Sequence, residues 1–204
     1  MKDNKKGTGK KLCYADYLEM SQPEEWWEII DGIPYSPNPT PPVIHQKVLG
    51  GLMVQIGEYL RGRKEEMLFT IDVRMPEKGQ TDMETTNVVQ PDIAVVCDPR
   101  KIDEKGCMGS PDWIIEIVSL ATIKRDKMEK FQLYERMGVL EYWIVYPREQ
   151  FLEVYRLGEK YKYSLFGIFT VEDCVSTSIF DDIAIKLNKV FQPENRGTAT
   201  SKRQ

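Results

Sequence analysis

The sequence predicts an α/β (α+β) protein in which a mixed central sheet is flanked by helices. Apolar residues recur at helical spacing from Val43 to about Arg61 and again from about Thr122 to Met137. Short apolar stretches, among them 113–119 and 141–146, have the composition of buried strands. Helix, strands, helix and strands therefore follow one another along the chain, an order typical of a mixed sheet with helices packed against it.

Turn residues delimit the individual elements. A short helix is expected over 14–20, and WWEIIDGIPYSPNP is typical of two strands around the turn Asp31-Gly32. Gly138 ends the second long helix, and Pro147 ends the strand EYWIVY. The other expected strands are 68–75, 88–97, 113–119 and the hairpin of LEVYRL with KYKYSLF, broken near Gly158.

The length and the hydrophobic fraction suit one domain with tails. A chain of 204 residues, 41% of them hydrophobic, is most simply a single domain with a real core. We expect this domain over 13–191, between a disordered basic tail at 1–12 and a disordered polar tail at 192–204. No apolar run approaches the roughly 18 residues of a membrane span, and the N-terminal residues lack the apolar stretch of a signal peptide. We therefore expect no membrane association.

The cysteines, the histidine and the charge balance exclude several classes of protein. The four cysteines form no CxxC pair, which favours free thiols in a reducing compartment, and hence a cytoplasmic location, over a disulfide frame or a zinc site. A single histidine excludes a site built on several imidazoles. The net charge of −4 argues against non-specific coating of nucleic acid, although the acidic metal site of a nuclease would also lower the total.

Asp92 is an acid at the mouth of an apolar strand. The run VVQPDIAVVCDP contains four consecutive apolar residues and stops at Asp98-Pro99, yet it begins with Pro91-Asp92. For an isolated Pro-Asp, a turn at the start of a strand is the simplest interpretation. A functional interpretation of Asp92 therefore needs partners elsewhere in the chain.

Glu116 lies in the middle of another apolar strand, DWIIEIVS. Strand alternation divides this segment into two apolar faces, one with Ile114, Glu116 and Val118 and the other with Trp113, Ile115 and Ile117. Because both faces are apolar, the segment is expected to be a central strand. A carboxylate buried there needs a cation, a metal or a proton, and a structural ion pair is the alternative to a functional site.

Lys130 is centred on the apolar stripe of the second long helix. At 100° per residue, its companions within a sector of about 80° are Ile123, Asp126, Leu133, Tyr134 and Met137. Lys130 either extends toward solvent or meets a buried anion, and Asp126 could pair with it from one turn away. His45 is similarly placed on the apolar stripe of the first long helix, where a satisfied core or capping histidine is the ordinary interpretation.

The combination of these residues indicates hydrolysis of a phosphodiester. Two carboxylates on adjacent strands, Asp92 and Glu116, can hold Mg²⁺ (or Mn²⁺), which prefers oxygen ligands and keeps several waters. Such an ion activates water and stabilises charge on a phosphate. A nearby lysine, here Lys130, can orient the attacking water or stabilise the developing negative charge.

The order Pro-Asp, strand with Glu, then Lys resembles the PD-(D/E)XK nuclease superfamily. Within it, the chain resembles the Uma-two family of restriction-endonuclease-like proteins over roughly 14–190. The matching pieces, in the order of the family, are YADYLEM, WWEIIDGIPY, PPVIHQKV, VVQPDIAVV, DWIIEIVS, the helix with Asp126, Lys130 and Tyr134, GVLEYWIVYP and LEVYRL. The resemblance implies a restriction-endonuclease-like fold and a metal-dependent endonuclease that acts on DNA.

The resemblance also implies roles for single residues. Asp92 matches the Asp of the PD motif and Glu116 the acid of the second motif, so both are implied metal ligands. The superfamily usually has Lys two residues after this acid, where the chain has Val118, and Lys130 matches the lysine that substitutes for it in the Uma-two pattern. With Asp92, Glu116 and Lys130 as the catalytic set, the auxiliary positions that line the site are His45, Ser119, Asp126 and Tyr134.

Two turns depart from the family pattern. Ser119-Leu120-Ala121-Thr122 stands where the family usually reads Ser-Pro-Ser-Thr, and Tyr146 stands where it usually has Asp before Pro. Neither change removes an implied metal ligand.

Two other functions stay open on the residues alone. A non-catalytic module for nucleic-acid binding or assembly is favoured if Asp92 and Glu116 do not converge, or if Lys130 points away. A small-molecule phosphoesterase on the same site fits the acidic balance and the lack of a long basic segment. A homodimer is considered because restriction enzymes of this superfamily often act in pairs, but no segment indicates an interface.

Overall fold

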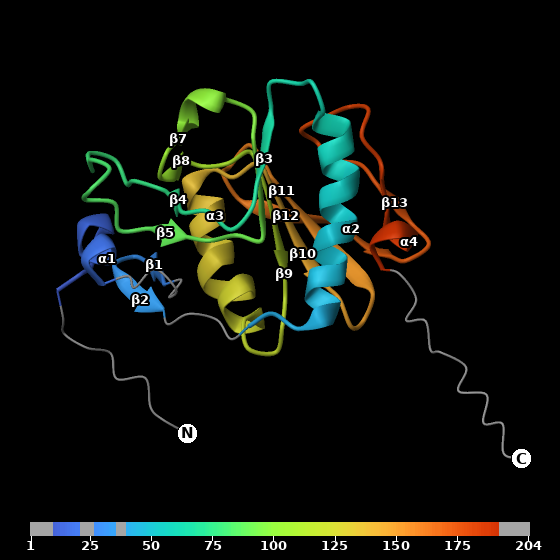
Figure 1. The fold of residues 1–204 in the computed structure, drawn as a ribbon, viewed down its shortest axis with the longest axis horizontal. Coiled ribbons are helices and arrows are strands. Elements are labelled where there is room, and N and C mark those ends of the chain that lie inside the picture. Colours follow the sequence, from blue (N-terminus) through green and yellow to red (C-terminus); the bar gives the residue numbers. More distant parts are fainter. Residues whose placement is uncertain (1–9, 21–26, 36–39, 192–204) are drawn as a thin grey trace, which may run out of the picture.

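The computed structural model describes residues 10–20, 27–35 and 40–191 (Figure 1). Two six-stranded sheets, here named the central sheet and the side sheet, contain most of the strands in this part of the chain. A further antiparallel pair joins β13 (Cys174–Val175) to β14 (Ile185–Lys186). The predicted α/β (α+β) class with a mixed central sheet is confirmed, and the side sheet is an addition that the sequence did not predict.

The central sheet is mixed, with the strand order β12-β11-β10-β9-β6-β3. β9 and β10 run parallel, and the remaining neighbours are antiparallel. Its strands are β3 (Glu66–Leu68), β6 (Ile93–Val96), β9 (Trp113–Ile117), β10 (Glu141–Tyr146), β11 (Phe151–Leu157) and β12 (Tyr163–Thr170).

The side sheet has the order β2-β1-β5-β4-β8-β7 and carries helix α1 (Tyr14–Met20). Asp31 and Gly32 both adopt positive φ, 54° and 78°, in the turn between β1 and β2, as the Asp-Gly pair predicts. The strands are β1 (Glu28–Ile30), β2 (Ile33–Tyr35), β4 (Val73–Arg74), β5 (Val88–Val89), β7 (Ile102–Asp103), which follows a 3-10 turn at Pro99–Lys101, and β8 (Gly106–Met108).

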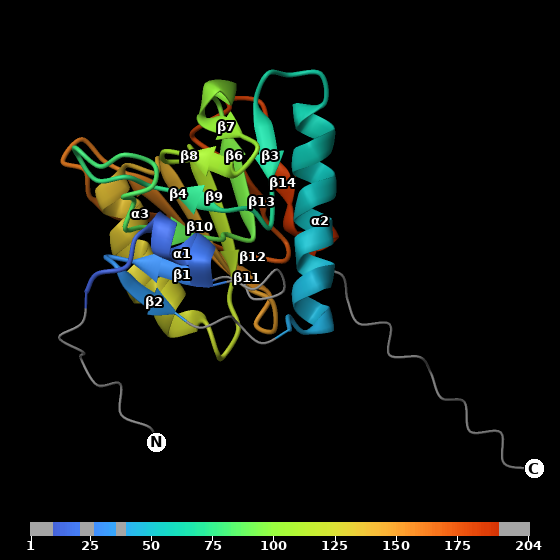
Figure 2. The same cartoon turned by 60° about the vertical axis from the view of Figure 1, so that its left-hand side comes forward.

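Helices cover both faces of the central sheet (Figure 2). Helix α2 (Val43–Leu60) and the short α4 (Leu187–Val190) pack on the face that includes Trp113, Ile115 and Ile117. Helix α3 (Phe131–Met137) packs on the opposite face, with Ile114 and Val118. β9 is therefore buried on both faces, as its strand alternation predicts.

The second long helix contains a π-helical segment, Arg125–Lys130, that follows two α-helical residues and continues into α3. We call Arg125–Met137 the site helix. Gly138 ends it with a φ of 81°, a left-handed conformation that glycine adopts without strain, in agreement with the predicted helix end.

Two stretches predicted as single strands are each divided. Residues 68–75 contribute to β3 and then to β4, and residues 88–97 contribute to β5 and then to β6. In both cases the two halves lie in different sheets. Pro91, which has no backbone N–H to donate to a ladder, falls between β5 and β6. The prediction of one continuous strand was wrong there, and the chain passes from the side sheet to the central sheet at Gln90–Asp92.

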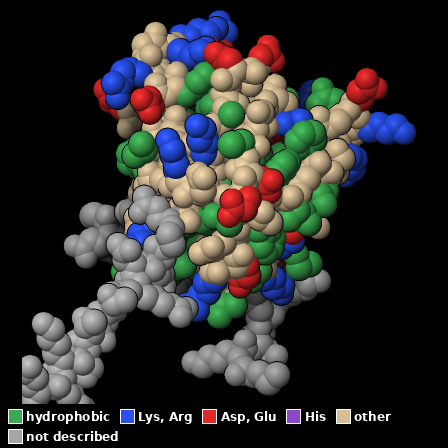
Figure 3. Space-filling view, turned by 90° about the vertical axis from the view of Figure 1, so that its right-hand side faces the viewer, with side chains coloured by type: hydrophobic (Ala, Val, Ile, Leu, Met, Phe, Trp, Pro, Cys, Tyr) green, Lys and Arg blue, Asp and Glu red, His purple; other side chains and the backbone are tan. Residues whose placement is uncertain are grey.

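The predicted tails fall mostly outside the described residues. Within 10–12, the backbone N–H of Leu12 donates to the carbonyl oxygen of Gly32 at 2.9 Å. The single domain over 13–191 stays a prediction. In the described part of the chain, no helix combines the length and apolar character that a membrane crossing requires. Figure 3 shows the side toward α4, where acidic, basic and apolar side chains are interspersed.

Candidate active site

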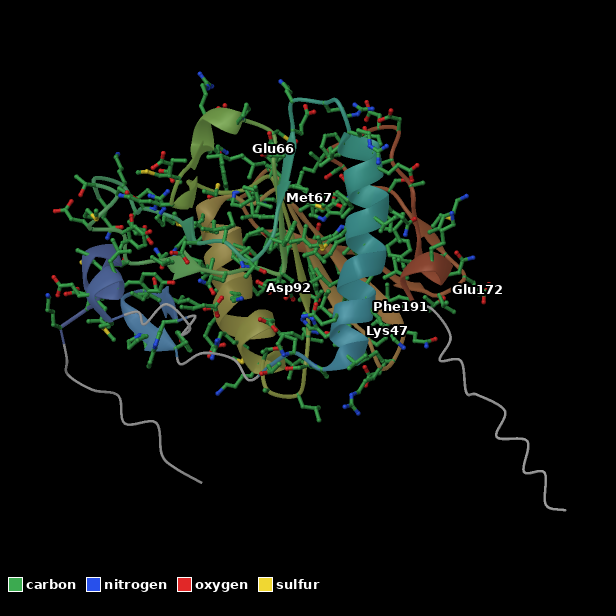
Figure 4. The ribbon with its side chains drawn as sticks, in the orientation of Figure 1. Lys47, Glu66, Met67, Asp92, Glu172 and Phe191 are labelled. Carbon is green, nitrogen blue, oxygen red and sulfur yellow. The ribbon has the colours of Figure 1, made fainter. Side chains whose placement is uncertain are left out.

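Asp92 lies where the chain leaves the side sheet and begins β6, and its label in Figure 4 stands between α2 and α3. Its Oδ2 accepts a hydrogen bond from the backbone N–H of Ile117 at 2.7 Å. Nε2 of His45, in the first turn of α2, lies 3.2 Å from both carboxylate oxygens of Asp92. The carboxylate is thus held beside Glu116, because Ile117 is the next residue of β9.

Glu116 projects from the middle of β9 toward the site helix and is 4% exposed. Its Oε1 accepts hydrogen bonds from Nζ of Lys130 at 2.8 Å and from the hydroxyl of Tyr134 at 2.7 Å. Burial raises the pKa of this carboxyl well above its usual value, against the opposing effect of Lys130, and the charges of Asp126 and Asp92 raise it further. The buried acid predicted in β9 is therefore paired with the lysine predicted on the helix.

Lys130 is 2% exposed and lies among three carboxylates. Its Nζ is 2.7 Å from Oε1 of Glu28, 2.8 Å from Glu116 and 3.9 Å from Asp126. Burial disfavours the ammonium, but Glu116, Glu28 and Asp126 outweigh that effect, so the pKa of Lys130 is raised. The lysine therefore points inward, and the alternative in which it extends to solvent does not hold.

Glu28 is a member of this cluster that the sequence interpretation missed. It lies in β1, is 3% exposed, and accepts hydrogen bonds from the backbone N–H of Gln90 at 2.9 Å and from Nη1 of Arg125 at 3.0 Å. Burial opposes its ionisation, but Lys130 and these donors lower its pKa below the usual value. The available signal was the position of Glu28 inside WWEIIDGIPY, one of the pieces that carry the family resemblance.

The cluster contains more acidic groups than basic ones. Asp126 is 3% exposed, and burial raises its pKa to about 6, against the opposing effect of Lys130. The basic members of the cluster are Lys130 and Arg125, and its acidic members are Glu28, Glu116, Asp126 and Asp92. Four carboxyl groups near two cations make a site that favours an additional cation.

A pocket of about 320 Å³ opens over these side chains. Asp92, Glu116 and Lys130 line it, and so do His45, Ser119 and Asp126, so six of the seven predicted site residues share one cavity. Tyr134 is the exception, because it is fully buried behind Glu116 and reaches the site through their hydrogen bond. Ser119 contributes to the turn at the pocket wall, where its Oγ lies 3.2 Å from Oγ1 of Thr122.

The donor set of the pocket suits a hard divalent cation. Among the described residues, no group of three or more His, Cys, Asp and Glu side chains is arranged to hold a metal by itself. Mg²⁺ is usually held by one or two carboxylates, with waters and substrate phosphates completing its shell. Asp92, directly before β6, and Glu116, in the neighbouring strand β9, match that pattern at a site with more acidic than basic groups.

The comparison with protein families covers nearly the whole chain. The family model described as "Uma2: Putative restriction endonuclease" matches residues 14–188. The chain belongs to the Uma2 family. Residues 14–188 contain the hairpin with Glu28, the Pro-Asp pair, β9 and the site helix, so the family match includes every member of the charged cluster.

Solved structures show the same fold for this Uma2-family chain. A crystal structure titled as a putative nuclease belonging to DUF820, from Anabaena variabilis, superimposes with a TM-score of 0.68 at 20% identity, covering 88% of this chain and 97% of that one. A search of curated proteins found no match. The family and the fold together support a nuclease, that is, a hydrolase of phosphodiester bonds.

Proposed function

We propose that this Uma2-family chain is a metal-dependent endonuclease that hydrolyses phosphodiester bonds of DNA, with Mg²⁺ or Mn²⁺ as its cofactor. The observation that carries the proposal is the convergence of Asp92, Glu116 and Lys130 in one pocket, reached from two strands and the site helix. A non-catalytic module would have been favoured if Asp92 and Glu116 did not converge or if Lys130 pointed away, and neither condition is met.

Asp92 and Glu116 are the proposed metal ligands. The side chain of Asp92 is 23% exposed and that of Glu116 is 5% exposed, so Asp92 presents its carboxylate to the open part of the pocket. A Mg²⁺ ion bound there would supply positive charge to a substrate phosphate and activate a water molecule. The hydrogen bonds of His45 and of the Ile117 N–H hold Asp92 in the orientation that this requires.

Lys130 is the proposed electrostatic catalyst. Its ammonium stays charged because the surrounding carboxylates raise its pKa, and it lies at the pocket wall beside Glu116. A fixed positive charge in a buried site stabilises negative charge that develops on a phosphate, because it needs no reorganisation during the reaction. Tyr134 positions Glu116, and Asp126 with Ser119 completes the wall on the side of the helix.

Location and assembly stay predictions that accompany this proposal. All four cysteines are free thiols in the structure, which fits the cytoplasm as a reducing compartment. The homodimer expected from the resemblance can be tested by light scattering on the purified chain across a range of concentrations.

The decisive experiment is a cleavage assay with matched variants. Supercoiled plasmid is incubated with the wild type and with Asp92→Asn, which keeps an oxygen for the Ile117 N–H, in the presence of Mg²⁺, Mn²⁺ or EDTA. Asp98→Asn is the control, because Asp98 lies at the far end of the same strand and bonds Arg100. We expect cleavage by the wild type and the control with either metal, and none by Asp92→Asn.

Two outcomes would contradict the proposal. Equal cleavage by the wild type and Asp92→Asn would identify a contaminating nuclease. Hydrolysis of a small chromogenic phosphodiester without any cleavage of DNA would favour a small-molecule phosphoesterase on the same site.

A further inference from the structure

Several apolar side chains lie at the mouth of the pocket, beside Thr40, Arg148 and Glu149, although its floor is charged. Glu116, Lys130 and Asp126, which form the floor, are buried. The lining residues that lie nearer the surface include a cluster of apolar side chains, here named the apolar mouth: Pro41, Pro42, Ile44, Leu120 and Ala121. With the proposed divalent cation bound at Asp92 and Glu116, a ligand that fills this pocket would carry an anionic group at one end and an apolar surface at the other.

Leu120 is held out into solvent by a closed turn. It is 89% exposed, more than any other large hydrophobic side chain in the described residues. The backbone N–H of Ser119 donates to Oγ1 of Thr122 at 3.0 Å, and the N–H of Thr122 donates to the carbonyl oxygen of Ser119 at 3.1 Å. These bonds leave Leu120 and Ala121 at the tip of the turn, where both line the pocket.

The pocket offers few positive charges for tracking a polynucleotide backbone. Its cationic lining residues are Lys130, which is bound to carboxylates, and Arg148, which is exposed and pairs with no carboxylate among the described residues. Proteins that grip a duplex through its phosphates commonly make about 6–10 such contacts. One available arginine suits a single phosphate next to the one at the floor.

The size of the pocket also limits what it can hold. Its volume of about 320 Å³ lies at the lower end of the roughly 300–1,000 Å³ typical of ligand pockets. A volume of this order suits one nucleotide with its phosphate, whereas a base pair within a stacked duplex presents only its edge.

We propose, on the basis of the proposed function, that the site takes single-stranded or unpaired DNA, one nucleotide at a time, and that Leu120 packs against the face of the unstacked base. Apolar side chains such as leucine act as wedges against bases whose stacking is broken. The phosphate would lie beside Lys130 and the cation proposed at Asp92, and the base would lie in the apolar mouth. An intact duplex reaches the same position only after a base is flipped out, which consumes free energy.

Binding with Ca²⁺ in place of Mg²⁺ tests this inference with a cation at the site, and a gel checks that the oligonucleotide stays intact. A fluorescein-labelled oligonucleotide is offered as a single strand, as a full duplex and as a duplex with a few unpaired nucleotides, and fluorescence anisotropy gives each Kd. The variants are Leu120→Ser and, as a matched control, Leu140→Ser, an exposed leucine at the opposite end of β10 from the pocket.

We expect the single strand and the bubble to bind at least about tenfold more tightly than the duplex, because their bases are already unstacked. Leu120→Ser should weaken single-strand binding about tenfold and leave duplex binding unchanged, whereas Leu140→Ser should alter neither. Equal affinity for single strand and duplex would overturn the inference, and so would equal effects of the two variants.

Parallel cleavage assays with Mg²⁺ separate this inference from the proposed function. Preferential, Leu120-dependent binding of single strands without cleavage would refute the nuclease proposal and support the inference. Cleavage of the duplex as fast as the single strand would support the nuclease and refute the inference.

Discussion

The ammonium of Lys130 lies 2.7 Å from a carboxylate oxygen of Glu28, so the site helix is anchored to the first hairpin of the chain. This contact connects the side sheet to the site helix. Glu28 belongs to the side sheet, and Lys130 of the site helix packs against β9 of the central sheet. Glu28 also supplies a counter-charge to Lys130. Without it, Glu116 would have to neutralise both Lys130 and any bound cation.

Glu28→Gln should therefore lower both stability and activity. The change leaves Lys130 and Arg125 short of a buried counter-charge, and breaking a buried ion pair costs about 3 kcal/mol. Urea unfolding should show this loss, and the cleavage rate should fall about tenfold or more. Glu77→Gln, which removes an exposed ion pair with Arg136, should cost less than about 1 kcal/mol and leave the rate unchanged. Equal losses for the two variants would contradict the role of Glu28.

His45→Ala should weaken metal binding more than it weakens the fold. Without the ring, Asp92 keeps the hydrogen bond from the Ile117 N–H but loses its second restraint. Losing a residue that orients a metal ligand typically costs about 10–100-fold in metal affinity or activity. A Mg²⁺ titration of the cleavage rate measures the shift, and His45→Gln, which keeps an N–H donor, should recover part of it. An unchanged Mg²⁺ dependence in His45→Ala would refute the positioning role.

Divalent metal should stabilise the wild type against heat. An ion that binds only the folded state adds about 2.7 kcal/mol when its free concentration is about 100-fold above its Kd. The melting temperature should therefore rise with Mg²⁺ in the wild type and in Asp98→Asn. It should stay constant in Asp92→Asn, which lacks one of the two proposed ligands. A rise of equal size in all three would place the metal elsewhere.

The stability of the metal-free protein should depend on Asp126 with a defined sign. Burial raises the pKa of this carboxyl to about 6 in the folded state from 3.8, so the folded protein holds its proton more tightly than the unfolded chain. Its contribution to stability is therefore greatest below about pH 4 and is lost as the pH rises through about 6. Asp126→Asn should be more stable than the wild type at pH 7, with the difference vanishing near pH 4. Urea midpoints in EDTA at each pH measure it, and a difference that grows on acidification would contradict the assignment.

The inward direction of Lys130 could be predicted from helical periodicity, despite a local irregularity. The segment Arg125–Lys130 is π-helical, so its residues turn through a smaller angle than the periodicity assumed. Over the four residues from Asp126 to Lys130 the difference is small enough that both still face the sheet. The burial of Asp126 and Lys130 could be predicted because both lie on the apolar stripe of the helix, which is visible in the sequence.

The division of 88–97 between two sheets could be predicted only in part. Pro91 signals a break in a ladder, but alternation and hydrophobicity are the same on both sides of it. Which sheet each half joins depends on pairing with β1, β4 and β9, and these contacts join segments distant in sequence. The position of Asp92 at a strand start was predictable, and its position between two sheets was not.

Glu28 shows a stronger limit on sequence reasoning. In a short hairpin, an acidic residue next to two isoleucines suits a solvent-facing position as well as a buried one. Its burial depends on Lys130, Arg125 and Gln90, which reach it from other elements. Only the fold brings those donors together, so the burial of Glu28 could not be predicted from the residue pattern of the hairpin.

The change of sheet at Pro91 makes this site depend on contacts between distant parts of the chain. Glu28, Asp92, Glu116 and Lys130 come from both sheets and from the site helix, so the cluster exists only after the two sheets have docked. Contacts between segments so far apart in sequence close slowly, because chain entropy opposes them until they are made. A truncated chain that ends before Lys130 lacks the cation that pairs with Glu28 and Glu116.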